Sequence, residues 1–419
     1  MSHLAQHCRD IATRARRAAI DLANIPAEKK AACLKAAAAH IRADVDAILA
    51  ANKLDVAAAP GFGLTAAAID RLTLDAKRVE GIAAGVEAVA LLPDPVGEVL
   101  EETTRPSGLV VKKIRVPLGV VFFIYESRPN VTADAAAVAL AAGNAIILRG
   151  GKEAAHSSGR IVESMRAAIA ASGLPVDCVQ LVDTPDREAV GEFLKMDDLI
   201  DIVIPRGGET LIRRVCSEAR MPVLKHFNGN CHVYVDKAAD LAMAKAITVN
   251  AKCQRMGVCN AAESLLVHRD IAAKFLPDVA AALGEHKVEI VGDEATRKLV
   301  PTAGPATEAD WATEYLGPKI SVAVVESVDG AIDHINRYGS RHTDSIVTAD
   351  KAAADRFAAR VDTAVVMVNA STRFNDGGEM GLGAEIGIST DKLHARGPCG
   401  TKELTTYKFI VLGSGQVRA

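Results

Sequence analysis

The spacing of hydrophobic and polar positions changes near residue 118 and separates two kinds of sequence. Residues 1 to about 92 carry alanine-rich apolar positions at helical spacing, broken near Asn24–Pro26 and Ala59–Gly63, and they predict several helices. Thr103–Pro117 sets Leu109, Val111 and other apolar residues among polar ones, which predicts an extended segment. After it, short apolar runs alternate with helical patterns.

This alternation predicts an α/β fold with a parallel, doubly wound sheet, because strands that alternate with helices through short glycine loops form that architecture. The predicted strands of the first region are Val120–Ile124, Asn144–Arg149, Val179–Val182 and Leu199–Ile204, and the predicted helices are Asp134–Ala142, one ending near Ser172, and Glu188–Leu194.

A second α/β region is expected from about Asn230. Its predicted strands are Val233–Val235, Ser264–Val267, Ile320–Val325 and Ala364–Val368. The tail Thr405–Leu412 is extended and apolar on more than one face. A strand of that kind needs a partner, so we expect a subunit interface and a homo-oligomer.

Composition and charge narrow the functional classes. The 419 residues are too many for one ordinary core, so two or three domains are expected. The formal net charge of -3, without long blocks of one sign, favours neither a nucleic-acid nor a membrane partner. The N-terminus does not read as a signal peptide, and no run approaches the roughly 20 apolar residues of a membrane span.

The eight cysteines show no CxxC pair, which argues against a zinc ribbon or a redox dithiol and fits reduced thiols in a cytoplasmic protein. The adjacent Cys231 and His232 are expected to pack rather than to bind a metal, and we predict no metal site.

Cys259 is the residue with the clearest potential for chemistry. It lies in a short polar loop between a helix-like run, Lys237–Lys252, and the apolar stretch Ser264–Val267. Arg255 and Lys252 are close in sequence and would hold the thiol partly as the nucleophilic thiolate. Taken alone, Cys259 fits a buried packing cysteine better. The other motifs of the chain, described next, favour the interpretation of Cys259 as a nucleophile.

Two junctions between a strand and a helix combine glycines with a cation. They are Arg149-Gly150-Gly151-Lys152 and Pro205-Arg206-Gly207-Gly208. Backbone N–H groups at a helix start, beside a cationic side chain, attract phosphate. Each loop alone fits a tight turn better, since neither matches a dinucleotide or P-loop fingerprint. Together, at one sheet edge, they predict a nucleotide site, and their cations favour NADPH over NADH.

Several stretches in one order resemble the gamma-glutamyl phosphate reductase family, also called glutamate-5-semialdehyde dehydrogenases, of the aldehyde dehydrogenase superfamily. They cover most of the chain, and the chain length agrees. The matching segments are 116–119, 124–132, 143–153, 204–208, the Cys259 loop, 331–346, 368–374, 381–385, 393–398 and 404–408.

The resemblance implies an aldehyde-dehydrogenase-like fold with a Rossmann-like NADPH domain, an α/β catalytic domain and a β-arm that pairs subunits. It places the NADPH domain at 1–103 and 118–229, the catalytic domain at 230–390, and the arm at 104–117 and 391–419.

The activity that the resemblance implies is reduction of L-glutamyl 5-phosphate by NADPH to glutamate 5-semialdehyde and phosphate, the second step of proline synthesis from glutamate. Cys259 would form a thioester that accepts hydride, and Asn130 would help to bind the oxyanion. A turn-forming Asn after Pro129 is an equally good interpretation of Asn130. A labile acyl phosphate also makes a complex with glutamate 5-kinase plausible.

The resemblance also implies which residues bind the substrate anions and the cofactor. Arg128, Arg255 and Arg373 are candidates for the substrate phosphate or α-carboxylate, because guanidinium groups match both shapes. Glu314 would grip the nicotinamide ribose, although Leu316 stands where the superfamily motif has an aromatic residue.

Three rival functions stay open. In a hydrolytic aldehyde dehydrogenase acting on another semialdehyde, a glutamate activates water, whereas this chain has His226 near the matching position. A cofactor-free cysteine hydrolase would use His268 or His342 as the base. A non-catalytic scaffold for a kinase is the third.

Overall fold

The structure is a computed structural model that describes residues 2–418. Contacts between residues divide the chain into two compact units, which are described separately. Unit 1 contains Met1–Lys225, Gly381–Gly387 and Cys399–Ala419, and unit 2 contains His226–Met380 and Ile388–Pro398. Among the described residues, no helix combines the length and the apolar character that a membrane span requires.

The first part of unit 1 is helical, as the alanine-rich spacing predicts. Side-chain caps start three of its helices: Ser2 accepts from the Ala5 N–H, Thr65 from that of Ala68 and Asp75 from that of Arg78. The helices are α1 (His3–Leu22), α2 (Ala27–Ala43), α3 (Val45–Ala58), α4 (Ala66–Leu72) and α5 (Ala76–Ala90).

A parallel sheet follows in unit 1, with strand order β5-β4-β3-β6. Its central strands are buried along almost their whole length, which explains their nearly continuous apolar sequences. The strands are β3 (Val120–Tyr125), β4 (Ala145–Arg149), β5 (Val179–Leu181) and β6 (Ile202–Arg206). The chain returns from β5 to the far side of β3, so the strand order reverses between β3 and β6, where ligands of such sheets bind.

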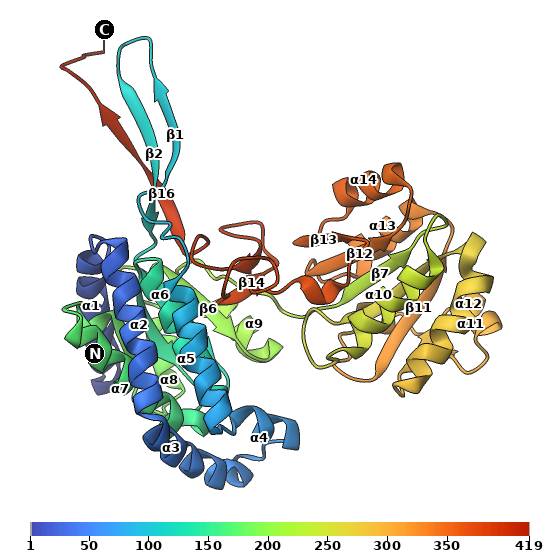
Figure 1. Cartoon of the computed structure of the whole chain (residues 1–419), viewed down its shortest axis with the longest axis horizontal. Helices are drawn as coiled ribbons and strands as arrows, with labels where there is room; N and C mark the ends of the chain where they lie inside the picture. The colour runs from blue at the N-terminus through green and yellow to red at the C-terminus, as the bar shows by residue number, and fades with distance from the viewer. Residues whose placement is uncertain (1, 419) are drawn as a thin grey trace. The chain divides into compact units, whose positions relative to one another are not determined.

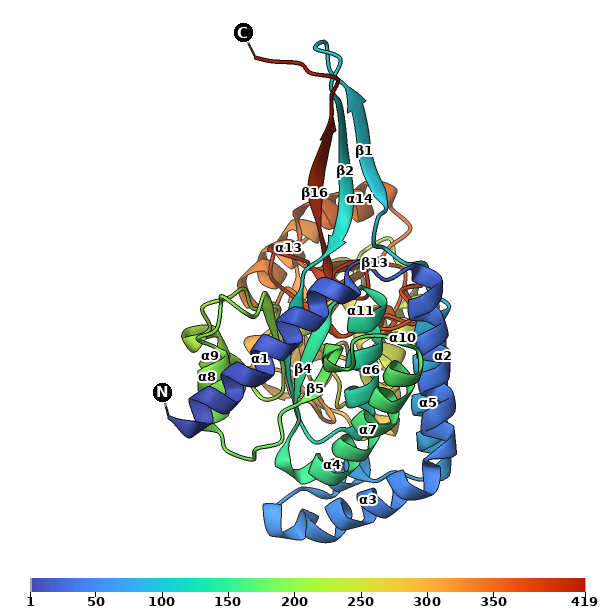
Figure 2. The same ribbon diagram turned by 90° about the vertical axis from the view of Figure 1, so that its left-hand side faces the viewer.

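Three helices connect these strands, and a fourth follows β6. The first begins at Pro129 rather than at Asp134, because proline is well suited to the first helical position. The helices are α6 (Pro129–Ala141), α7 (Ala155–Ala171), α8 (Glu188–Phe193) and α9 (Glu209–Glu218). Figure 2 shows α2, α5, α6 and α7 running beside one another over this part of unit 1.

Three antiparallel strands form an arm that extends away from the helices of unit 1 (Figure 1). They are β1 (Val99–Thr104), β2 (Val110–Pro117) and β16 (Thr405–Leu412). The single extended segment expected for Thr103–Pro117 is therefore wrong, because a hairpin turn at 105–109 interrupts it. Gly108 takes φ 84° there, and its N–H donates to the Arg105 carbonyl oxygen at 2.8 Å. The C-terminal strand finds its partner in β2 of the same chain.

Unit 2 is built around a seven-stranded parallel sheet with order β10-β9-β11-β8-β7-β12-β13. The predicted strands are confirmed, and β9, β10 and β12 are additional. The strands are β7 (Cys231–Val235), β8 (Ala262–His268), β9 (Glu289–Gly292), β10 (Gly304–Pro305), β11 (Lys319–Val325), β12 (Thr343–Val347) and β13 (Val365–Val368).

The remaining elements of the chain are five helices that pack on the large sheet of unit 2 and one two-stranded sheet. Buried aliphatic and aromatic side chains pack between the helices and the large sheet, with Phe275 and Phe357 among the largest. The helices are α10 (Leu241–Cys253), α11 (Arg269–Glu285), α12 (Glu294–Leu299), α13 (Val328–Tyr338) and α14 (Lys351–Arg360), and β14 (Gly387–Ser389) pairs with β15 (Gly397–Cys399).

Candidate functional site

Cys259 lies in the loop that joins the end of α10 to the start of β8, as the sequence predicts, and its side chain is half-buried. Residues at and just before the start of β7 support this loop closely. The Cys231 thiol donates to the Cys259 carbonyl oxygen at 3.2 Å. A Cβ atom on Gly229 would lie only 1.9 Å from that oxygen and 2.6 Å from the Cys259 Cα. The chain therefore needs glycine at position 229 to bring the two backbones together.

Asn260 fixes the loop from the other side. Its side chain is buried and donates to the Asn375 carbonyl oxygen at 2.9 Å, while its own carbonyl accepts from the Thr372 hydroxyl at 2.7 Å. Arg373 donates to the Asn260 side-chain oxygen and, at 2.9 Å, to Gln254. Segment 372–375, far away in the sequence, thus holds the Cys259 loop.

We expect Gly229→Ala to lower turnover by about a hundredfold, since the new methyl group must displace the Cys259 backbone, and a misplacement near 1 Å costs that much. The control is Gly257→Ala in the same loop, whose Cβ would meet only the Leu316 carbonyl oxygen at 3.8 Å. Steady-state kinetics of both variants check this, and equal activities would contradict it.

Arg255 and Arg373 are the two predicted anion-binding arginines of the region around Cys259. Burial lowers the pKa of Arg373, and the charge of nearby Arg255 lowers it further, while Asp376 and the Cys259 thiolate oppose the shift. Arg373 is therefore near enough to both Arg255 and Cys259 for their charges to interact. Arg255 is exposed, whereas Arg373 is half-buried. An anionic substrate is favoured by this positive environment.

Lys252 does not take the place that the sequence suggested for it beside the thiol. Its side chain is fully buried, and its ammonium pairs with the buried Glu263 carboxylate at the start of β8. Burial raises the pKa of Glu263 to about 7, and Lys252 opposes that shift. Glu263 also accepts from the Leu316 N–H at 3.2 Å. The charge of Lys252 is thus neutralised within the core.

Glu263 connects the Cys259 loop to the segment that contains Glu314. Leu316 has φ 52°, which is unusual for a residue with a side chain, and its hydrogen bond to Glu263 holds it there. Sequence reasoning missed this role of Glu263. The available signal was a lysine and a glutamate on opposite flanks of one loop, but their pairing depends on how α10 and β8 lie together.

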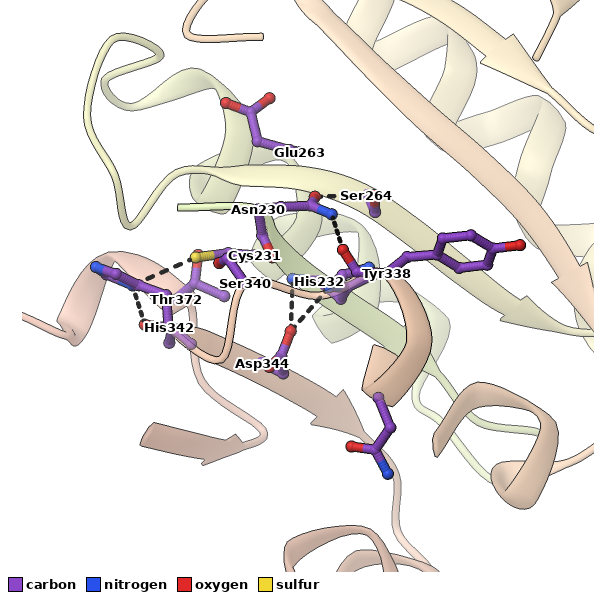
Figure 3. A network of polar contacts seen from close by, with 12 residues as sticks. Asn230, Cys231, His232, Glu263, Ser264, Tyr338, Ser340, His342, Asp344 and Thr372 are labelled. Carbon is purple, nitrogen blue, oxygen red and sulfur yellow. Dashed lines mark hydrogen bonds and ion pairs between the residues drawn. The ribbon is translucent and has the colours of Figure 1, made fainter. Parts of the chain in front are cut away.

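Two histidines lie beside the thiol. One ligand-capable atom from each of His226, Cys259 and His342 falls within 4.8 Å of the others. The His226 Nδ1 lies 3.0 Å from the Ile388 carbonyl oxygen, to which it donates. The buried His342 contacts the Thr343 hydroxyl at 2.8 Å and the Cys231 sulfur at 3.6 Å through its Nδ1 (Figure 3).

Two other histidines of unit 2, His268 and His232, have structural surroundings. His268 ends β8, at the end of the strand opposite to the Cys259 loop, and caps α11 by accepting from the Asp270 N–H. Of the two bases considered for a cysteine hydrolase, only His342 is thus near the thiol. His232 is buried and paired with Asp344 at 2.9 Å, which is consistent with the packing role expected for Cys231 and His232 (Figure 3).

Unit 1 contains a cavity of about 620 Å³ at the carboxyl ends of its parallel strands. The predicted loop Arg149–Lys152 lines it, together with Arg128 and the cations Arg187 and Arg214. A Cβ atom on Gly150 would meet the Tyr125 hydroxyl at 3.0 Å, and one on Gly151 would meet Glu153 at 2.5 Å. Glycines here let the backbone itself form the wall of the cavity.

Arg149 ends β4 and is held by three backbone carbonyls, including that of Gly150 at 2.6 Å. Burial lowers its pKa. Its Nε is buried and has no hydrogen-bond partner among the described residues. The register pairs Ile124 with Arg149 and Tyr125 with Arg206, so the two arginines flank the end of β3. An anion with several oxygens suits this cationic wall.

The second predicted loop, Pro205–Gly208, is arranged differently. The Gly208 N–H at the start of α9 donates to the Glu126 carboxylate at 2.7 Å. A side chain of this protein therefore holds the helix-start donor that the sequence assigned to a phosphate. Glu126 also lines the cavity, so the Pro205–Gly208 loop adjoins it through this residue.

Asn130 lies exposed in the first turn of α6 in unit 1, where its side chain donates to Asp134 at 3.0 Å. Burial raises the pKa of Asp134 to about 6, and the hydrogen bond from Asn130 opposes that shift. Asn130 and Arg128 belong to unit 1, whereas Cys259, Arg255, Arg373 and Glu314 belong to unit 2.

Comparisons with known proteins agree with this architecture. The sequence model of the aldehyde dehydrogenase family matches residues 3–310 and 300–384. A gamma-glutamyl phosphate reductase from Rhodopirellula baltica is 60% identical over 415 residues, covering 99% of this chain and 96% of the relative. The crystal structure of the Thermotoga maritima gamma-glutamyl phosphate reductase has a TM-score of 0.96 and 45% identity, and covers 98% of this chain and 100% of that one.

The fold is shared with a more distant structure, that of glyceraldehyde-3-phosphate dehydrogenase from Methanocaldococcus jannaschii in complex with NADP. The TM-score is 0.69 at 19% identity, and the match covers 98% of this chain and 95% of that one. The predicted aldehyde-dehydrogenase-like architecture is thereby confirmed. The chain belongs to the aldehyde dehydrogenase family and, within it, to the gamma-glutamyl phosphate reductases.

Proposed function

We propose that this protein reduces L-glutamyl 5-phosphate with NADPH to L-glutamate 5-semialdehyde and phosphate, through a thioester on Cys259. The observation that carries the proposal is the half-buried Cys259 thiol on a loop held by Gly229, Cys231 and Asn260. Relatives at 52–60% identity named gamma-glutamyl phosphate reductase support the same reaction, which serves proline synthesis.

The chain's own groups fit the acyl-transfer half of this reaction. The Cys259 thiolate attacks the acyl phosphate carbonyl, a C–S bond forms, and the C–O bond to phosphate breaks with phosphate carrying away the electron pair. Arg255 and Arg373, which lie near the thiol, would stabilise the negative charge of the substrate. Arg128 lines the unit 1 cavity and remains a candidate for a substrate anion.

NADPH, when bound, supplies the hydride that turns the thioester into the aldehyde. The cavity of unit 1 fits such a cofactor, because glycine backbone, the buried Nε of Arg149 and several cations line it. Arg149, Gly150, Gly151 and Lys152 of this cavity would hold its phosphates, with Pro205–Gly208 beside them. Glu314 of unit 2 stays the residue that the resemblance gives for the nicotinamide ribose. The relative from M. jannaschii was solved with NADP, so the fold accommodates that dinucleotide.

The arm supports pairing with a second copy of the chain. Large apolar side chains remain half exposed on its strands: Val99, Leu100, Tyr407, Phe409, Val411 and Leu412. Surfaces of this kind are usually covered by a partner. We therefore propose a homo-oligomer. A complex with glutamate 5-kinase and a cytoplasmic location stay predictions.

Phosphate dependence tests the proposed function against the hydrolytic alternative. The proximity of His226 to Cys259 is the observation that favours hydrolysis, because an imidazole there could activate water. Purified protein is given glutamate 5-semialdehyde, NADP and increasing phosphate, and NADPH absorbance is followed. We expect NADPH formation to require phosphate and acyl phosphate to be released.

Arsenate in place of phosphate is the matched control, because it can attack the same thioester. Sustained oxidation of the aldehyde in a buffer free of both anions would overturn the proposal in favour of the hydrolytic enzyme.

A further inference from the structure

The three side chains around the Cys259 sulfur are those that a borderline-soft metal ion prefers. His226, Cys259 and His342 contribute one thiol and two imidazoles, and their ligand atoms lie within 4.8 Å of one another. They come from segments before β7, before β8 and before β12, and these three strands are neighbours in the sheet of unit 2. Parallel strands thus bring the three residues to one edge.

Hydrogen bonds already orient both imidazoles. The Nδ1 of His226 donates to the Ile388 carbonyl oxygen at 3.0 Å, which leaves the lone pair on Nε2. A backbone carbonyl that fixes the tautomer of a ligand in this way is a regular feature of metal sites. His342 is positioned through its Nδ1 by Thr343 at 2.8 Å and Cys231 at 3.6 Å. Its ring stands edge-on to that of His226, with 5.5 Å between centroids.

We propose that His226, Cys259 and His342 form a binding site for Zn²⁺ or a similar divalent transition metal, and that the bound ion reversibly blocks the thiol. Zinc bonds of about 2.3 Å to sulfur and about 2.0 Å to nitrogen place neighbouring ligand atoms roughly 3.5 Å apart. Side-chain movements on the order of 1 Å would close the site. The fourth tetrahedral position would be left to water.

Binding of the metal ion to the three side chains changes no oxidation state, so it needs no oxidant or reductant. The ion forms one bond to sulfur and two to imidazole nitrogens, and the thiol proton is released to solvent. The role is inhibitory rather than structural, because Gly229, Cys231 and Asn260 hold the loop without a metal. The positive charges of Arg255 and Arg373 oppose a cation, so we expect weaker binding than in a structural zinc site.

Cobalt spectroscopy of the full-length protein tests the site without relying on catalysis, so its failure would leave the proposed reaction untouched. Co²⁺ is added to reduced protein, and the spectrum is recorded. We expect a thiolate-to-cobalt charge-transfer band and the intense visible bands of a tetrahedral ion, both displaced by Zn²⁺. Activity, measured in parallel, should fall with Zn²⁺ and return with a chelator.

Variants separate a three-ligand site from a metal held by a thiol alone. Cys259→Ala should abolish the charge-transfer band, and His226→Ala and His342→Gln should each weaken Co²⁺ binding on the order of tenfold or more. The half-exposed His226 keeps the test valid if the buried position 342 does not tolerate change. Cys253→Ser and His286→Ala, outside the cluster in unit 2, are the matched controls and should bind normally.

Unchanged affinity in folded His226→Ala, or a charge-transfer band that persists in Cys259→Ala, would overturn the proposal. Binding lost equally in the two control variants would overturn it as well.

Discussion

Replacing Cys259 with serine is expected to reduce turnover by roughly four to six orders of magnitude, as loss of a nucleophile does in enzymes that form covalent intermediates. The hydroxyl has nearly the same size, so the loop held by Gly229 and Asn260 should keep its conformation. A hydroxyl is not ionised near neutral pH, however, and it is a far weaker nucleophile than a thiolate. The structure therefore predicts lost chemistry without lost folding.

Two measurements check this expectation. Steady-state kinetics give the loss of turnover, and mass spectrometry of intact protein after mixing with substrate should show acylated wild type and unmodified Cys259→Ser. The matched control is Cys253→Ser, six positions earlier at the end of α10, which should retain both activity and acylation. A loss of less than about tenfold, or a thioester on another cysteine, would refute the role of Cys259.

Replacing Lys252 with methionine is expected to lower the free energy of unfolding by about 3–5 kcal/mol, because the Glu263 carboxylate would be left buried without its counter-charge. The double variant Lys252→Met with Glu263→Leu removes both charges and keeps a similar volume. Replacing a buried ion pair by apolar residues is often nearly neutral, so the double variant should be much more stable than the single one.

Urea unfolding measures both effects. Trp311 is the only tryptophan of the chain and belongs to unit 2, so its fluorescence follows the unit that contains the pair. Lys298→Met is the control, because that lysine is exposed and pairs only at the surface. If the single and double variants were equally unstable, the cost would lie in packing rather than in the unpaired charge.

Much of the fold was predictable because it rests on local pattern. Buried parallel strands such as Val120–Tyr125 produce short apolar runs, and their alternation with helices is readable in one sequence. The hairpin that interrupts Thr103–Pro117 was missed, although Pro106, Ser107 and Gly108 are turn-forming residues at the point where the chain reverses.

The sequence allowed the site to be predicted where a single residue, Cys259, has the reactive group. It did not reveal contacts between residues that are far apart in the sequence. Cys259 stands out through its loop, whereas the burial of Lys252 against Glu263 depends on how α10 meets β8. Likewise, the contact between Asn260 and Arg373 spans more than a hundred positions. The cluster of His226 and His342 with Cys259 arises from the order of parallel strands, which a single sequence does not reveal.

The pairing of β16 with β2 affects the order in which the protein folds while the ribosome synthesises it. During translation the edge of β2 opposite to β1 has no strand to join until residues 405–412 leave the ribosome, after all of unit 2. Residues 226–380, which form most of unit 2, emerge earlier and as one stretch. Domains that are contiguous in sequence fold as they appear, and pairings between distant segments come late. The arm is therefore completed after unit 2, and until then one edge of β2 has no strand partner.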